Sequence, residues 1–225
     1  MKRSLSFILL VVLYAGFLNI PDTSAATWLQ PPSGWGSFLS SANFSAWPAD
    51  DFRFDSETAV ERVDWWSVGA IADMPVADGF YVRFYSNYYD ADLGISIADE
   101  LLYEVFIPGN AHQTQDGDHS HYYAELSTPF LAIGGRPYWV SIQGDFTNDP
   151  DDDYWWGWAM SSTHNRNPAE YNSPTYNHRP INEFHSSYYD LAFELHGSPV
   201  PVPGAVWLLG SGLCGLVTIC KKRKR

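Results

Sequence analysis

The fold is decided by the stretch Phe80-Tyr81-Val82-Arg83-Phe84-Tyr85. Its apolar residues alternate with residues that carry a polar group, which is the period of a β-strand with one face buried and one face wet. The same alternation recurs in Tyr138–Gln143 and Leu191–His196. Three separate parts of the chain therefore predict strands of the same kind.

Working outward from these stretches, shorter candidate strands are separated by turn residues such as Pro108-Gly109-Asn110 and Gly134-Gly135. Many short strands with turns between them predict an all-β fold, an antiparallel β-sandwich that is jelly-roll-like. Only Ile97–Leu102 offers an alternative helix of one or two turns, so a parallel α/β fold lacks the helices it needs. The shorter candidates are Asp51–Phe54, Glu61–Val68, Leu102–Ile107, Tyr122–Leu126 and Tyr154–Met160.

The first 26 residues are typical of a secretory signal peptide. Lys2 and Arg3 precede an apolar run from Ser6 to Phe17, and small residues follow. We expect cleavage after Ala25 or Ala26. The alternative is an uncleaved N-terminal anchor, but the run is short for a bilayer span of about 20 residues.

The last residues, 199–225, combine three parts in a fixed order. A proline-rich motif comes first and is predicted to be extended and exposed, because proline cannot continue a helix or a ladder. An apolar segment from Gly204 to Cys220 follows, predicted to be a transmembrane helix of about 25 Å. A basic cluster ends the chain and places the tail end on the cytoplasmic side, so the body lies outside. The motif is Val200, Pro201, Val202, Pro203 and Gly204, and the basic cluster is Lys221, Lys222, Arg223, Lys224 and Arg225.

This order closely resembles the PEP-CTERM sorting signal, with Val200-Pro201-Val202-Pro203 in place of the commoner Val-Pro-Glu-Pro. The missing glutamate leaves open which exosortase subtype reads it. The resemblance implies an inner-membrane precursor with its body on the periplasmic side. An exosortase would then remove the tail, and the body would be released or attached at the cell surface. A plain C-terminal anchor is the alternative.

Between the two targeting segments, residues 27–198 form the predicted β-sandwich ectodomain. The full chain has 13 Lys+Arg and 26 Asp+Glu, and this part keeps 6 basic and 25 acidic residues, a formal charge of −19. Such a surface repels nucleic acid, so we exclude a nucleic-acid partner. Both cysteines, Cys214 and Cys220, lie in the apolar tail segment, so the ectodomain has no disulfide and no cysteine nucleophile.

The ectodomain also resembles the β-sandwich domains often found ahead of PEP-CTERM tails. The similarity lies in the order Asp50-Asp51-Phe52, Val63-Asp64-Trp65-Trp66, Phe80–Tyr85, Leu101-Leu102-Tyr103-Glu104, Tyr138–Ile142 and Trp156-Gly157-Trp158. These are strand-core residues, and the resemblance implies no catalytic residue. We expect residues 27–48 to be a loose lead-in.

Tryptophans beside carboxylates raise a carbohydrate-binding alternative, because sugar C–H faces stack on indole rings. The candidates are Trp139, Trp155 and Trp156. Adjacent tryptophans on a strand point to opposite faces, so about half of these rings are expected to be core. A lectin needs at least two exposed coplanar rings, whereas buried rings favour a structural protein.

Two polar segments are weighed as metal sites. Asp151, Asp152 and Asp153 concentrate carboxylates that calcium could bind, although their spacing is not an EF-hand and a solvated acidic loop is the favoured interpretation. His119-Ser120-His121, with His112 nearby, could bind zinc, but polar residues of a hairpin are favoured. No cofactor other than this calcium option is expected.

No nucleophile-elbow or zinc-protease motif is present in the sequence, and we predict a protein that is not an enzyme. The leading hypothesis is a non-catalytic exported cell-surface or extracellular-matrix protein, sorted and processed by an exosortase, with exopolysaccharide as a further candidate partner. The alternative is a lectin-like module that calcium could assist.

Overall fold

The computed structural model describes residues 25–42, 45–68, 77–92, 94–109, 111–148, 156–163, 167–172, 179–180 and 189–200. Within Ala25–Pro199, which forms one compact unit, the described residues build β-strands and no α-helix. None of the described segments is a helix long and apolar enough to cross a membrane. The predicted signal peptide before Ala25 and the predicted tail helix lie outside the described residues.

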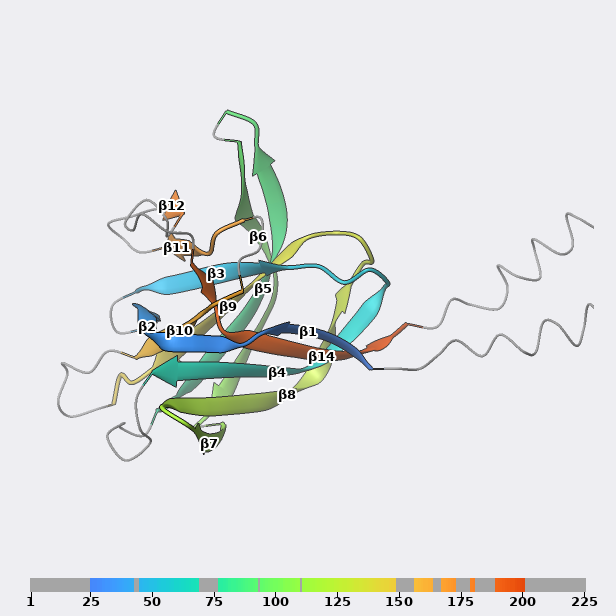
Figure 1. The fold of residues 1–225 in the computed structure, drawn as a ribbon. Helices are drawn as coiled ribbons and strands as arrows, with labels where there is room; N and C mark the ends of the chain where they lie inside the picture. Colours follow the sequence, from blue (N-terminus) through green and yellow to red (C-terminus); the bar gives the residue numbers. More distant parts are fainter. Residues whose placement is uncertain are drawn as a thin grey trace, which may run out of the picture. The chain divides into compact units, whose positions relative to one another are not determined.

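Two sheets make up this unit (Figure 1). Sheet A contains eight strands: β1 (Ala26–Gln30), β2 (Pro32–Leu39), β4 (Thr58–Val68), β7 (His112–Asp116), β8 (His119–Ala132), β10 (Gly157–Ser161), β13 (Asp190–Leu191) and β14 (Phe193–Pro199). Sheet B contains six, in the order β12 (Arg179–Pro180), β11 (Glu170–Asn172), β3 (Trp47–Phe52), β9 (Tyr138–Asp145), β5 (Gly79–Asp90) and β6 (Ile95–Pro108).

Neighbouring strands pair antiparallel in both sheets. The longest ladder joins β5 to β6, and β9 lies on the other side of β5. The predicted all-β antiparallel architecture is therefore confirmed. The jelly-roll connectivity stays a prediction.

The inner faces of the two sheets share one core, in which aromatic rings make many of the contacts. Trp65 of sheet A meets Phe80 of sheet B, with ring centroids 5.1 Å apart. Trp65 also stacks on Tyr122 of the neighbouring strand at 5.7 Å. Phe80 and Trp65 are both fully buried. Aromatic side chains bury large areas, so these rings stabilise a fold that has no disulfide in this unit.

Two sequence predictions are corrected here. Ile97–Leu102 lies inside β6 and is not helical, because pairing with β5 along the whole hairpin outweighs a weak local helix preference. The expected loose lead-in, residues 27–48, instead contains β1, β2 and the start of β3. β2 pairs with β10, more than 100 residues later, and no local pattern carries that contact.

Strand β14 has a central place in sheet A. It pairs with β1 on one side, from Ala26↔Gly197 to Gln30↔Phe193, and with β4 on the other. Gly197 lies at a bulge where a Cβ would come within 2.5 Å of the Ala59 carbonyl oxygen, so the strands approach closely there. The first and last strands of the unit, β1 and β14, are therefore hydrogen-bonded neighbours in sheet A.

The contact between the sheets can be tested at Phe80. Phe80→Ala removes a fully buried ring that touches Trp65, Tyr122 and Trp156. We expect the free energy of unfolding in urea to fall by about 3–5 kcal/mol. Phe106→Ala on the next strand, where the ring is 41% exposed, is the matched control and should cost about 1 kcal/mol or less. Equal losses would contradict the assignment of Phe80 to the core.

Candidate functional site

Trp139 and Trp156, two of the three predicted sugar-binding residues, are completely buried. Trp156 lies in the main core, 5.4 Å from the Phe80 ring. Trp139 lies on the opposite face of sheet B, where its Nε1 donates to Asn87 Oδ1 at 2.9 Å. A sugar face cannot reach either ring without displacing packed side chains, so the sequence prediction is corrected for these two residues. Trp155 lies outside the described residues.

The other predicted sites lie at the ends of the described residue ranges or outside them. Asp151, Asp152 and Asp153 lie outside it, as do Pro201 and the rest of the sorting motif after Val200. At the N-terminal side, Ala25 precedes β1 and Ala26 is its first residue. Among the described ranges, no group of three or more His, Cys, Asp or Glu residues is arranged to hold a metal ion.

The best-organised polar cluster lies on the outer face of sheet A and is centred on Asp64 of β4. Arg62 donates to both carboxylate oxygens, from Nη2 to Oδ1 at 2.6 Å and from Nε to Oδ2 at 2.7 Å. His121 of β8 donates to Oδ1 from Nε2 at 2.9 Å. His196 of β14 places Nε2 at 3.2 Å from Oδ2, close enough for an ion pair but without hydrogen-bond geometry. We call these four residues the Asp64 cluster.

The Asp64 cluster ties three strands together, because its members come from β4, β8 and β14. Only 3% of the Asp64 side chain is exposed, so its charge needs the partners that surround it. A bidentate arginine is the strongest such partner, and Arg62 also lies 4.0 Å above the Tyr123 ring. The Trp66 ring stacks on the His121 ring, with ring centroids 4.8 Å apart. The cluster therefore holds the outer face of sheet A in register.

A relay of polar groups passes through His121. Its Nδ1 lies 3.3 Å from Thr114 Oγ1, which gives the order hydroxyl, imidazole and carboxylate. That order also occurs in nucleophilic catalysis. Here, however, the carboxylate of Asp64 is already paired with Arg62, and the hydroxyl contact is long. We assign the relay to structure. His119 and His121 of the β7–β8 hairpin contact the Gly34 carbonyl and Asp64, and His112 stacks on Tyr123.

A second polar group lies between the sheets. Asp50 of β3 is fully buried and accepts hydrogen bonds from the Leu191 backbone N–H at 2.5 Å and the Asp51 N–H at 2.8 Å. Burial, together with the nearby charges of Asp190 and Asp51, raises its pKa well above the usual range. Through these hydrogen bonds Asp50 links sheet B to β13 of sheet A.

A third buried carboxyl belongs to Glu170 of β11. Only 3% of Glu170 is exposed, and its Oε2 accepts the Ala98 backbone N–H at 3.0 Å. Among the described residues, none forms a hydrogen bond with its Oε1. Burial raises the pKa of Glu170 to about 8, opposed by the Ala98 hydrogen bond. Because Ala98 belongs to β6, Glu170 fastens the far half of the β5–β6 hairpin over the outer face of sheet B.

A small aromatic cluster lies on the outer face of sheet B, beside that half of the hairpin. It contains Trp139, Ala49, and Tyr85 and Ala98 of the hairpin itself, all buried. Trp47 stacks on Tyr85 with ring centroids 5.5 Å apart and planes within 7°. Sheet B is therefore buried on both faces along part of its length. This arrangement explains why the Trp139 ring faces away from the main core and is nevertheless inaccessible.

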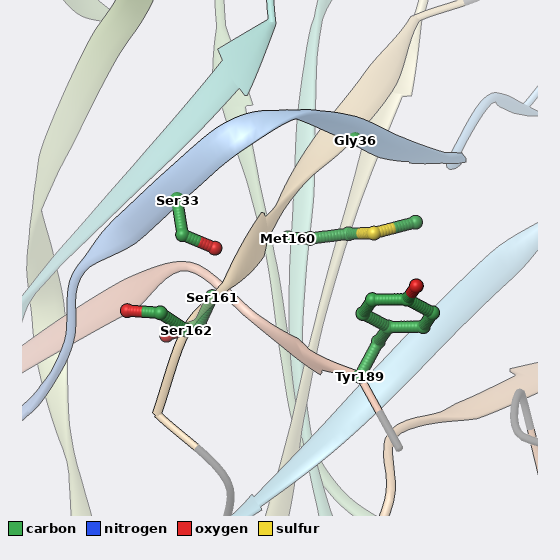
Figure 2. Close-up of a pocket in the computed structure, with 6 residues that line it drawn as sticks. All are labelled: Ser33, Gly36, Met160, Ser161, Ser162 and Tyr189. Carbon is green, nitrogen blue, oxygen red and sulfur yellow. The ribbon is translucent and has the colours of Figure 1, made fainter. Parts of the chain in front are cut away.

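A shallow cavity of about 350 Å³ opens near the β2–β10 pair (Figure 2). Its lining residues are Ser33, Gly36, Met160, Ser161, Ser162 and Tyr189, with the Met160 side chain and the Tyr189 ring on one side and serine hydroxyls on the other. Gly36 leaves room for Met160, whose Sδ lies 2.4 Å from the place of a Cβ. The lining suits a small hydroxylated molecule but contains no charged group. These lining residues do not indicate a particular reaction.

Residues 26–196 match the family described as Domain of unknown function (DUF7901). The chain belongs to this family. The match ends three residues before β14 does and does not include the C-terminal tail. A search of curated proteins found no match.

The sequence analysis did not single out Asp64, Glu170 or Asp50 for these roles. The alternation in β4 does place Arg62, Asp64 and Trp66 on one face, so a charged pair two residues apart was available as a signal. Glu170 and Asp50 gave no signal, because their partners Ala98 and Leu191 lie 72 and 141 residues away.

The buried Glu170 carboxyl predicts how stability depends on pH. Its pKa is 4.5 when unperturbed and about 8 in the folded chain, so the folded state holds more protons between these values. Stability must therefore fall as pH rises from about 4.5 to about 8, by at most about 4 kcal/mol for this group. In urea unfolding at pH 5 and pH 9, Glu170→Gln should lose less stability across that interval than the native chain. The same loss in both proteins would contradict the prediction.

Proposed function

We propose that the chain is an exported, non-catalytic protein of the cell surface or extracellular matrix whose C-terminal tail is read and removed by an exosortase-type enzyme. The signal peptide, residues 1–26, would direct secretion. The tail would hold the precursor in the inner membrane, with the ectodomain on the periplasmic side. An exopolysaccharide matrix is the proposed setting, and the formal charge of −19 suits a soluble extracellular body.

One observation carries this proposal: the folded unit fits between the two proposed processing sites. β1 begins at Ala26, where signal cleavage is expected, and β14 ends at Pro199, directly before the sorting motif. Cleavage after Ala25 and between Pro199 and Gly204 would therefore leave every described strand whole, and cleavage after Ala26 would remove only the first residue of β1.

The position of β14 also limits where the tail can be cut. Because β14 pairs with both β1 and β4, a cut inside it would remove a central strand of sheet A. A cut between Pro199 and Gly204 leaves this ladder whole. The proline-rich motif lies in that interval, and prolines favour the extended backbone that a processing enzyme can bind.

Two of the three candidate residues for carbohydrate binding are inaccessible. A lectin needs at least two exposed coplanar rings, and Trp139 and Trp156 are both buried. Tyr88 and Tyr89 are more than half exposed, but neighbouring residues on a strand point to opposite faces. Buried tryptophans favour the structural role, which is the one we propose.

The sorting motif can be tested by substitution. Pro201→Ala with Pro203→Ala should give a longer product that stays in the membrane, because the extended motif would be lost. Mass spectrometry of membrane and medium fractions measures this. Pro199→Ala is the matched control, since this proline closes β14 beside Thr58 and lies outside the motif. If the double variant is processed and located like the native chain, the proposal fails.

A further inference from the structure

Strand β6 forms a long, open edge of sheet B. Its 14 residues pair with β5 and with no other strand in the described part of the chain. The edge strands β1 and β7 have five residues each and β12 has two. Proteins usually protect a long edge with lysine, proline or a covering segment, because its backbone groups can pair with another chain. Between Ile95 and Ile107, β6 has no lysine, arginine or proline.

Part of this edge is already covered, because the Ala98 N–H donates to Glu170. The Glu100 N–H is used within the hairpin, where it donates to Ser86 Oγ of β5 at 3.0 Å. Within the described part of the chain, no side chain accepts a hydrogen bond from a backbone N–H of the stretch Leu101–Ile107, which we call the β6 edge. Seven residues are enough to pair with one strand of ordinary length.

The inner side of the β6 edge leaves the core partly uncovered. Tyr103, Val105 and Ile107 pack against the main core but are only half-buried. Their neighbours on β5, Val82 and Phe84, are fully buried. The core therefore continues beneath β6, where these side chains remain partly exposed to solvent. A further strand with apolar side chains on its inner face would bury these three residues.

The outer side of the edge is apolar and acidic. Leu101, Leu102 and Phe106 are 48%, 45% and 41% exposed, and Glu104 stands between them. Asp99 and Glu100 continue the negative charge beyond the edge. Arg83 on β5 binds Glu104 at 2.6 Å. Basic side chains on an added strand would thus meet acids, while its apolar side chains meet the core.

We propose that the β6 edge is a docking site for an extended segment of another protein in which apolar and basic side chains alternate. The added strand continues sheet B, which is a known mode of peptide recognition. A second copy of this chain fits less well. Antiparallel self-pairing brings two acidic stretches together, on bodies that each carry a formal charge of −19. The inference is independent of how the tail is sorted.

The test uses the Ala25–Pro199 fragment, which contains every described strand and the whole described core as one compact unit. The probe is a fluorescent peptide of eight residues that alternates lysine and valine. Fluorescence anisotropy at 0.15 M salt, roughly physiological, reports its binding. We expect at least tenfold weaker binding for a peptide of equal charge with proline in place of valine. A glutamate–valine peptide should not bind.

Matched variants locate the site. Leu102→Lys adds a positive charge at the β6 edge and should weaken lysine–valine binding at least tenfold. Leu131→Lys adds the same charge at a 58% exposed position on β8 and should leave binding within twofold. Phe106→Lys is the second edge variant, and urea unfolding confirms that all three fold.

Three results would overturn the proposal. Equal binding of the lysine–valine and lysine–proline peptides would show simple charge attraction. Equal effects of Leu102→Lys and Leu131→Lys would place binding elsewhere. Self-association of the fragment that Leu102→Lys abolishes, without peptide binding, would assign the edge to a second copy.

Discussion

The ladder between β1 and β14 sets the limits of the folded body. Five residue pairs, from Ala26↔Gly197 to Gln30↔Phe193, join the first strand to the last. Since β14 also pairs with β4, it lies inside sheet A, and the sheet is incomplete until the chain has been made through Pro199. The main core depends on this closure, because Phe193 and Leu195 of β14 are fully buried in it. The proposed targeting segments lie outside this ladder, whereas the core requires β14.

A second constraint is that sheet B is buried on both faces along part of its length. Its inner face packs on sheet A, and its outer face is covered by the β5–β6 hairpin, which Glu170 holds at Ala98 and Asn87 holds at Trp139. Buried carboxyls accompany this arrangement: Asp50 lies between the sheets and Glu170 lies under the hairpin. Burial raises the pKa of both carboxyls, and that of Glu170 reaches about 8, so Glu170 serves as a largely neutral hydrogen-bonding group at pH 7 in an otherwise acidic protein. The part of β6 beyond this cover is the part left open.

Local patterns predicted the strands but not their long-range contacts. The alternation in Phe80–Tyr85 and Tyr138–Gln143 gave β5 and β9, because period two is a property of neighbouring residues. β2 was missed because proline and glycine break its pattern. β1 was missed because it is short and its pairing partner, β14, is distant in sequence. Trp139 was read as a candidate for sugar binding because its cover, the β5–β6 hairpin, cannot be seen from the strand itself. The proposed sorting motif was the most specific sequence feature, and it bears on localisation rather than on what the ectodomain contacts.

The central claim is that the mature protein is the folded unit between the two processing sites. Its most direct test is the intact mass and terminal sequence of the product exported by cells that contain an exosortase. The account predicts a chain that begins at Ala26 or Thr27 and ends between Pro199 and Gly204, with β14 complete and β1 lacking at most Ala26. A product that still begins at Met1 and ends at Arg225, or one cut within Phe193–Pro199, would contradict it.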